Sequence, residues 1–413
     1  MSILIKNISC LVQAETSPVR WVAGARMAEL PVIHDAYLEI KNELISGFGY
    51  MKDFDKKIKY DNVIDATGKF VFPSFCDSHT HLVYAGSREM EYIDKIKGFT
   101  YEEIAKRGGG ILNSSALIHR TSEDDLYKQS MERIHEIIGL GTGAVEIKSG
   151  YGLSVEDELK MLRVIRRIKE TSPLEVRSTF MGAHAIPGNY RTHRSDYIYL
   201  IINEMIPAVA SEDLADFIDV FCDRGFFTVE ETEQILMAGM KYGMRARLHA
   251  NELDFSGGIV TGVRYNALSV DHLEYTDDDD IEALLGSETM PTLLPGASFF
   301  LGLPDPPVRK MICKGLPVAL ASDFNPGSSP SGNMKFIMSL GCIRLKMLPE
   351  EVINAVTINT AYALGISETH GSISKGKVAN LFITKKIPSY EYLPYAYGSD
   401  LIETVILRGN VIK

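Results

Sequence analysis

The sequence predicts an α/β fold: a (β/α)8 TIM barrel with a small β-sandwich domain built from both chain termini. Three observations predict it. Between about residues 70 and 360, short strand patterns alternate with helical patterns. Eight strands can be counted there, and further strand patterns lie near both chain ends. This number of alternating units favours a parallel barrel. A doubly wound open sheet remains the alternative, because periodicity alone does not exclude it.

The β domain is predicted from the two ends of the chain. Four segments there have the apolar or alternating pattern of strands: residues 3–5, 37–40, 379–383 and 401–407. Asn42-Glu43 turns the chain after the second of these segments. We expect residues 1–65 and 365–413 to form the composite β domain, and residues 66–364 to form the barrel.

The barrel strands are predicted from short apolar runs. Eight such runs lie in the central part of the chain: residues 71–72, 144–147, 175–181, 217–222, 246–249, 268–270, 292–294 and 318–321. Helical patterns separate them. Thr228 and Glu231 have the spacing of a capping box, and Gly243 ends the helix that follows. Ser154 caps a second helix, with apolar residues at helical spacing.

Length and composition bound the class of protein. A chain of 413 residues exceeds one ordinary core unless that core is a large barrel with an attachment. Its 45% apolar and 23% charged residues are typical of a soluble globular protein, and its net charge of −11 without a basic run argues against nucleic-acid binding. An anionic substrate would therefore need a local cation.

The cysteines and the apolar segments indicate the cellular compartment of the protein. Five cysteines are scattered along the chain and none forms a CxxC pair, which indicates a reducing compartment without disulfides. The first residues lack the apolar core of a signal peptide, and no run reaches membrane-spanning length. We expect a cytoplasmic protein that does not bind membranes.

Phe75-Cys76-Asp77-Ser78-His79-Thr80-His81 is the most informative segment. It follows the apolar run Phe70-Val71-Phe72 and carries two histidines two residues apart. In an extended strand, residues i and i+2 face the same side, so His79 and His81 project together. Such a pair can bind one divalent metal ion if further ligands come from elsewhere in the fold.

Further polar residues follow three other predicted strands: His249, His272 and Asp323. Catalytic groups of a barrel lie at the C-terminal ends of its strands. Each residue alone is more often a hydrogen-bonded core histidine or a turn carboxylate. Together with His79 and His81, however, His249 and Asp323 make a three-nitrogen, one-oxygen set suited to Zn²⁺ or Fe²⁺. Such an ion lowers the pKa of bound water to about 7, and His272 is then a candidate base or oxyanion stabiliser.

The order His79-x-His81, His249, His272, Asp323 resembles the amidohydrolase superfamily, which implies a (β/α)8 barrel with a terminal β domain. Many members hold a second metal ion through a carbamylated lysine on a middle strand. The strand that ends near His184 offers no lysine, so the resemblance implies a single divalent or trivalent ion, Zn or Fe. Lys148 lies on the second predicted strand and is interpreted as structural.

More specific segments occur in order along the chain: His81-Leu82-Val83-Tyr84-Ala85-Gly86-Ser87-Arg88, Gly108-Gly109-Gly110-Ile111, Glu146-Ile147-Lys148-Ser149-Gly150-Tyr151-Gly152, Gly182-Ala183-His184, Asp271-His272-Leu273-Glu274-Tyr275 and Ser322-Asp323-Phe324-Asn325-Pro326-Gly327-Ser328. Together they are similar to the imidazolonepropionase family. That family opens the lactam ring of 4-imidazolone-5-propanoate to give N-formimino-L-glutamate in histidine degradation, and its members are usually homodimers. The resemblance covers nearly the whole chain, although the first fifty or so residues match loosely.

The resemblance implies a set of substrate contacts: Arg88, Tyr101, Tyr151, His184, Glu252, Asn325, Gly327 and Ser328. Arg88 offers the planar fork that holds a carboxylate, although an ion pair with Glu89 or Glu91 is the simpler interpretation of that residue alone. Gly327-Ser328 resembles a backbone anion cradle.

The resemblance also implies catalytic roles. His272, with Asp323 or Glu252, would take the proton of a metal-activated water. His184 or His272 would stabilise the oxyanion. The sequence leaves open which residue carries each proton.

Two other hypotheses remain at this point. Another one-metal amidohydrolase, such as a purine or pyrimidine ring deaminase, would share the same metal chemistry. Arg88 with Tyr151 and Ser328 favours a carboxylate-bearing substrate instead. A non-catalytic barrel with a structural metal ion is the other class, and the intact ligand set with Glu252 argues against it.

Overall fold

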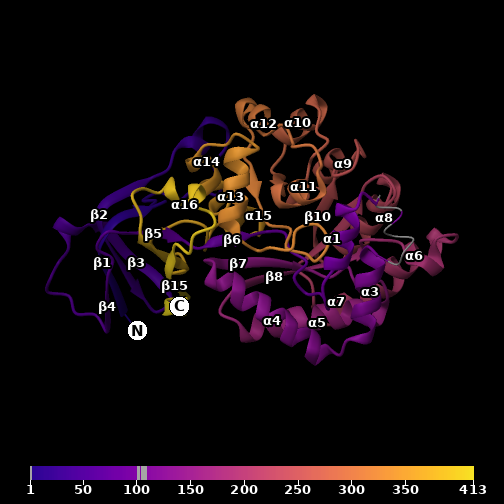
Figure 1. Cartoon of the computed structure of the whole chain (residues 1–413), viewed down its shortest axis with the longest axis horizontal. Coiled ribbons are helices and arrows are strands. Elements are labelled where there is room, and N and C mark those ends of the chain that lie inside the picture. Colours follow the sequence, from indigo (N-terminus) through magenta and orange to yellow (C-terminus); the bar gives the residue numbers. More distant parts are fainter. Residues whose placement is uncertain (1, 100–102, 104–108) are drawn as a thin grey trace.

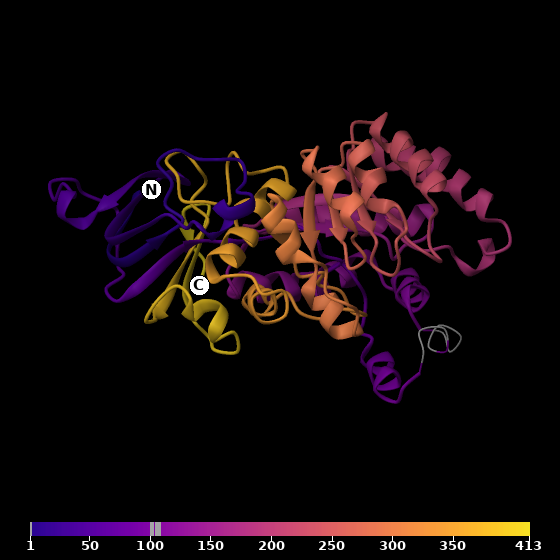
Figure 2. The same ribbon diagram turned by 90° about the horizontal axis from the view of Figure 1, so that it is seen from above.

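The computed structural model describes residues 2–99, 103 and 109–413. Figure 1 shows two units side by side: a barrel surrounded by helices, and a smaller sheet that contains both chain ends. Figure 2 shows the same separation from above. No helix in the described ranges is long and apolar enough to cross a membrane.

The barrel contains eight parallel strands in chain order: β6 (Phe75–Asp77), β7 (Thr142–Lys148), β8 (Glu175–Ala183), β9 (Phe217–Cys222), β10 (Arg245–Ala250), β11 (Ser269–His272), β12 (Met290–Leu293) and β13 (Ala319–Leu320). Each strand pairs with the next one along the chain. The first and last strands meet just beyond their ends, where Thr80 and Phe324 form a parallel bridge and the amide of His81 donates to the Phe324 carbonyl (2.9 Å). The predicted barrel is therefore confirmed.

Helices connect the barrel strands and pack around the sheet (Figure 1): α1 (Glu89–Ile96), α3 (Ile111–Arg120), α4 (Glu123–Gly139), α5 (Val155–Thr171), α6 (Arg194–Leu200), α7 (Ile206–Ser211), α8 (Val229–Met240), α9 (Gly258–Arg264), α10 (Asp278–Leu285), α11 (Pro295–Leu301), α12 (Val308–Lys314), α13 (Met334–Ile343), α14 (Pro349–Ala355) and α15 (Ile358–Ala363). Both hydrogen bonds of the predicted capping box of α8 are present: the Thr228 side chain accepts from the Glu231 amide, and the Glu231 side chain accepts from the Thr228 amide. The Ser154 hydroxyl accepts from the amide of Asp157 at the start of α5 (3.2 Å).

The terminal strands form one mixed sheet: β1 (Ser2–Val12), β2 (Val32–Lys41), β3 (Leu44–Tyr50), β4 (Asn62–Asp65), β5 (Lys69–Pro73), β14 (Leu381–Lys386), β15 (Ile402–Leu407) and β16 (Asn410–Val411), with the short helix α16 (Tyr392–Tyr395) between β14 and β15. The sheet branches at β1, which pairs with β4 near its start and with β5 near its end. The strands of the expected sandwich are thus joined into one continuous sheet. Asn42 and Glu43 form the predicted turn, with φ of 54° and 68°.

One predicted strand is wrong. Val71-Phe72, expected as the first barrel strand, lies in β5, which pairs antiparallel with β14 in the terminal sheet. The run is apolar because it is buried on both faces: Val71 joins the core of the terminal sheet, while Phe72 stacks on Phe382 in the core shared with the barrel. The first barrel strand is Phe75–Asp77 instead. We therefore propose that the boundary between the two units lies after Pro73 rather than at residue 65.

Candidate metal centre and active site

A cavity of about 1330 Å³ opens at the C-terminal ends of the barrel strands, and His81, His249, His272 and Asp323 line it. It also brings together seven of the eight predicted substrate contacts: Arg88, Tyr151, His184, Glu252, Asn325, Gly327 and Ser328. The eighth, Tyr101, lies outside the described residues. Segments that are far apart in the sequence therefore meet in one cavity, as expected for groups at the strand ends of a barrel.

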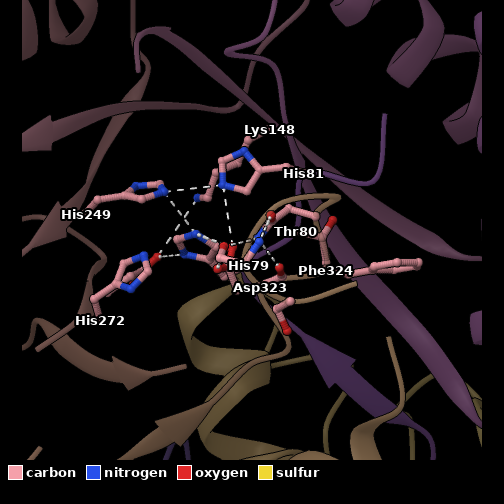
Figure 3. Close-up of polar contacts among 12 residues, drawn as sticks. His79, Thr80, His81, Lys148, His249, His272, Asp323 and Phe324 are labelled. Atoms are coloured by element: carbon pink, nitrogen blue, oxygen red, sulfur yellow. Dashed lines mark hydrogen bonds and ion pairs between the residues drawn. The ribbon is translucent and has the colours of Figure 1, made fainter. Parts of the chain in front are cut away.

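Four side chains converge at the barrel end of this cavity. Figure 3 shows the rings of His79, His81 and His249 pointing toward one another, beside Asp323. His249 Nε2 lies 3.1 Å from His79 Nε2 and 3.3 Å from His81 Nε2. Asp323 Oδ1 lies 3.7 Å from the Nε2 atoms of both His79 and His81. Atoms that share one ion at about 2.1 Å lie roughly 3 to 3.5 Å apart, so the spacing is close to that of a ligand set.

The tautomers of two histidines test whether this set fits a metal ion. His79 Nδ1 lies 2.6 Å from Asp271 Oδ2, and His249 Nδ1 lies 3.1 Å from Asp219 Oδ1. A proton on each Nδ1 leaves a lone pair on each Nε2. Two lone pairs 3.1 Å apart repel each other unless a cation lies between them. These two nitrogens, His81 Nε2 and a carboxylate oxygen therefore fit one divalent ion, and carboxylates lie behind His79 and His249 as is common around metal ligands.

The protonation of His79, His81 and Asp323 agrees with this interpretation. Burial lowers the pKa of His79 and His81 well below the usual value, so both rings are neutral, which is the form that binds metals. Burial raises the pKa of Asp323 to about 7. A cation among the Nε2 atoms would oppose that rise and hold the carboxyl group ionised.

Behind the histidines lies a buried network of charges that sequence reasoning missed. Lys148 Nζ lies 2.8 Å from Glu146 Oε1 and 2.8 Å from Asp219 Oδ2. Arg247 Nη2 lies 3.2 Å from Asp271 Oδ2. All five side chains are fully buried. A charged residue inside an otherwise apolar strand could have indicated this network, because a buried charged side chain needs a partner of opposite charge.

His272 and Glu252 form a second pair of titratable groups in the cavity. His272 Nε2 lies 3.7 Å from Glu252 Oε2, and its Nδ1 lies 3.9 Å from Glu274 Oε2. Burial, and then the nearby Glu274 carboxylate, raises the pKa of Glu252 well above its usual value. Asp223 fixes this segment by accepting the amides of Glu252 (2.7 Å) and Leu253 (2.9 Å). A buried carboxyl group of raised pKa is suited to carrying a proton near neutral pH.

Three residues at the same strand ends have a positive backbone φ. His272 and Leu273 have φ of 86° and 70°, and Asp323 has φ of 52°. Left-handed conformations of non-glycine residues cost about 1–3 kcal/mol each and cluster at functional sites. Two of these residues are predicted site residues: His272 is the last residue of β11, and Asp323 follows the end of β13.

His184 and Tyr151 line the cavity next to the metal ligand candidates. The His184 ring stacks on His81, with centroids 5.0 Å apart, and the Tyr151 ring lies 5.3 Å from His184. His184 Nδ1 lies 3.0 Å from the Gly150 carbonyl oxygen, which can only accept, so Nδ1 carries the proton. Burial lowers the pKa of His184 to about 3. The ring is therefore neutral, and its Nε2 is an acceptor rather than a donor.

Arg88 lies at another part of the cavity, and its side chain is only 9% exposed. Glu91 Oε2 accepts from Arg88 Nε (2.9 Å) and Nη2 (2.6 Å). The same oxygen accepts the amide of Gly110 (3.0 Å), and Glu91 Oε1 accepts from Asn113 (3.1 Å). The expected ion pair with Glu91 thus exists, and it fixes the guanidinium within the cavity wall instead of leaving it on the surface.

The loop after Asp323 is held by its own side chains. Asn325 Oδ1 accepts the amides of Gly327 (2.7 Å) and Ser328 (2.8 Å). Ser328 Oγ donates to Asp323 Oδ2 (3.2 Å). Both amides of the backbone anion cradle expected at Gly327-Ser328 donate to Asn325 in this structure, and the cradle stays a prediction. Through Ser328, the loop also supports Asp323 from behind.

Known proteins resemble this chain over its full length. An imidazolonepropionase from Flavobacterium johnsoniae is 57% identical over 412 residues and one from Christiangramia forsetii is 53% identical over 412, each alignment covering 100% of both chains. A family model described as the amidohydrolase family matches residues 269–412. Among solved structures, a 5-methylcytosine deaminase from Klebsiella pneumoniae liganded with phosphonocytosine has a TM-score of 0.73 at 19% identity, covering 100% of this chain and 98% of the other. At that identity the likeness concerns the fold alone.

Proposed function

The chain belongs to the imidazolonepropionase family of amidohydrolases and is thus a hydrolase that acts on a cyclic amide; we propose that the cavity at the strand ends opens the lactam ring of 4-imidazolone-5-propanoate. One observation carries the proposal. The predicted ligands His79, His81, His249 and Asp323 meet beside the same cavity that Arg88 lines. A ring carbonyl and a propionate of one small molecule then each have a chemically suited partner.

Arg88 binds the propionate. Glu91 occupies the edge of the guanidinium formed by Nε and Nη2. The other edge, formed by Nη1 and Nη2, therefore receives the substrate carboxylate through two hydrogen bonds. This pair is the local cation that a chain of net charge −11 needs for an anionic substrate. Tyr151 and His184 flank the ring of the substrate, and His184 Nε2 accepts from a ring N–H.

His79, His81, His249 and Asp323 hold one divalent ion. Such an ion polarises a carbonyl group and lowers the pKa of water from about 15.7 to about 7. Three imidazole nitrogens and a carboxylate suit Zn²⁺ and Fe²⁺ alike, so metal analysis of the isolated protein has to decide between them.

Glu252 moves the protons. It takes one from the water that adds to the ring carbonyl carbon, and returns it to the ring nitrogen as the C–N bond breaks. His272, 3.7 Å from Glu252, donates to the oxygen that becomes negatively charged. In this proposal His184 does not take that last role, because a proton on its Nδ1, toward Gly150, leaves Nε2 as an acceptor.

An assay separates this function from ring deamination. Incubation with 4-imidazolone-5-propanoate is expected to remove the absorbance of the ring, while guanine and cytosine release no ammonia. Release of ammonia from either base without ring opening of the imidazolone would contradict the proposal.

Gly327→Ala is expected to raise KM roughly tenfold or more with little change in kcat. A Cβ at Gly327 would overlap Arg88 Nη1, so the guanidinium has to leave its position. Steady-state kinetics measures the effect. Gly139→Ala is the control, because a Cβ there meets nothing within 4 Å. An unchanged KM in Gly327→Ala would show that the Arg88 position does not hold the propionate.

Assembly and location remain predictions from the sequence. We propose a cytoplasmic homodimer. Light scattering of the purified protein and fractionation of the producing cells are the measurements that check the two parts.

A further inference from the structure

Lys148 is a buried charge for which the proposed reaction has no direct use. Its side chain is fully buried within β7, and its Nζ lies 2.8 Å from both Glu146 Oε1 and Asp219 Oδ2. A third carboxylate oxygen, Asp271 Oδ2, lies 3.9 Å away. Burying an ammonium group costs free energy that an apolar side chain of similar size would not. Packing alone therefore does not explain a lysine at this position.

Two of these carboxylates also contact ligand histidines. Asp219 Oδ2 faces Lys148, while its Oδ1 accepts from the amide and from Nδ1 of His249 (3.1 Å each). Asp271 Oδ2 lies 2.6 Å from His79 Nδ1. The Lys148 ammonium group is thus linked through carboxylates to both His79 and His249, which are far apart in the sequence. Figure 3 shows Lys148 beside this group of rings.

The second buried cation does not replace Lys148. Arg247 contacts Asp271 (3.2 Å), and its other hydrogen bonds go to the carbonyl oxygens of Ala363 (2.6 Å) and Ser78 (2.7 Å). In the described part of the chain, Lys148 is the cation whose side chain pairs with Asp219. The orientation of His249 therefore depends on Lys148 through a single carboxylate.

We propose that Lys148 is a positioning residue of the metal centre, which fixes Asp219 and Asp271 so that His249 and His79 present Nε2 to the ion. This inference rests on the proposed function, because it needs a metal ion at the histidines. Carboxylates behind ligand histidines orient the rings and raise their basicity, and their loss typically costs about 10- to 100-fold in metal affinity. Lys148 lies beside these carboxylates rather than beside the histidines, and it holds both Asp219 and Asp271 in position.

The test is the Zn²⁺ affinity of the metal-free full-length protein, measured by competition with a chromophoric chelator. Lys148→Met keeps the length of the side chain and removes the charge. We expect its Kd for Zn²⁺ to rise about 10- to 100-fold. Circular dichroism checks that the variant is folded. A Kd equal to that of the unsubstituted protein would overturn the proposal.

A second buried lysine provides the matched control. Lys377 is 3% exposed, and its Nζ donates to the His370 carbonyl and to Ser372 Oγ (2.9 Å each), away from the histidine cluster. Lys377→Met removes a buried ammonium group as well, and its Kd for Zn²⁺ is expected to stay unchanged. An equal loss of affinity in both variants would mean that Lys148 acts through general stability, and would also overturn the proposal.

Three further outcomes are distinguishable. If Lys148→Met does not fold, Lys148→Gln keeps a hydrogen-bond donor without the charge, and the same rise in Kd is expected of it. If the unsubstituted protein opens the imidazolone ring but does not bind Zn²⁺ or Fe²⁺ at the histidines, the metal part of the proposed function fails. If it binds the ion and the Lys148 variants bind it equally well, only the role of Lys148 fails.

Discussion

Replacing Asp323 with Asn is expected to lower kcat/KM for ring opening by about a thousandfold or more while the protein stays folded. Asp323 is the one carboxylate among the four ligand candidates, and its Oδ1 lies 3.7 Å from two Nε2 atoms. Asn has the same shape but carries no negative charge to oppose that of a divalent ion. The loss is measured as kcat/KM, together with the metal content of the purified variant.

Thermal unfolding of the same variant separates catalysis from stability. Asp323→Asn should unfold within a few degrees of the unsubstituted protein, because Asn can keep the hydrogen bond from Ser328. Asp305→Asn, which changes a surface ion pair with Arg344, is the control for the substitution itself. A variant that keeps its turnover but loses much of its thermal stability would indicate a structural metal ion.

Replacing Glu252 with Gln is expected to lower kcat about 10²- to 10⁴-fold with a smaller change in KM. Glu252 is buried in the cavity, has a raised pKa, and lies 3.7 Å from His272 Nε2. Gln fills the same space but cannot accept and return a proton. Steady-state kinetics on the variant measures both constants.

The metal content distinguishes this variant from Asp323→Asn. Glu252 is not among the four ligand candidates, so Glu252→Gln should retain one ion per chain, as should the surface control Glu282→Gln, which breaks a pair with Lys314. Loss of the ion from Glu252→Gln, or a change in KM alone, would contradict the role of Glu252 in proton transfer.

The parts of the fold that follow from local sequence were predicted correctly. The capping box of Thr228 and Glu231 depends on residues three apart, and the turn at Asn42-Glu43 on residues that tolerate a positive φ. The site residues at strand ends could also be predicted from the sequence. A barrel places those ends around one opening, so His249 and Asp323 could be grouped with His79 and His81 before any contact was known.

The parts that depend on long-range packing could not be predicted. Phe70-Val71-Phe72 is apolar because two units bury it from opposite sides, and a sequence does not show which sheet such a run joins. Lys148 meets Asp219 across 71 residues, so its partner appears only when the barrel closes.

Titration of the metal-free protein tests the central claim most directly, namely that one ion at His79, His81, His249 and Asp323 supports ring opening. Zn²⁺ or Fe²⁺ is added stepwise, and bound metal and turnover of 4-imidazolone-5-propanoate are measured on the same samples. Turnover is expected to rise in proportion to bound metal and to level off at one ion per chain. Full turnover by the metal-free protein, or a plateau reached only at two ions per chain, would contradict the account.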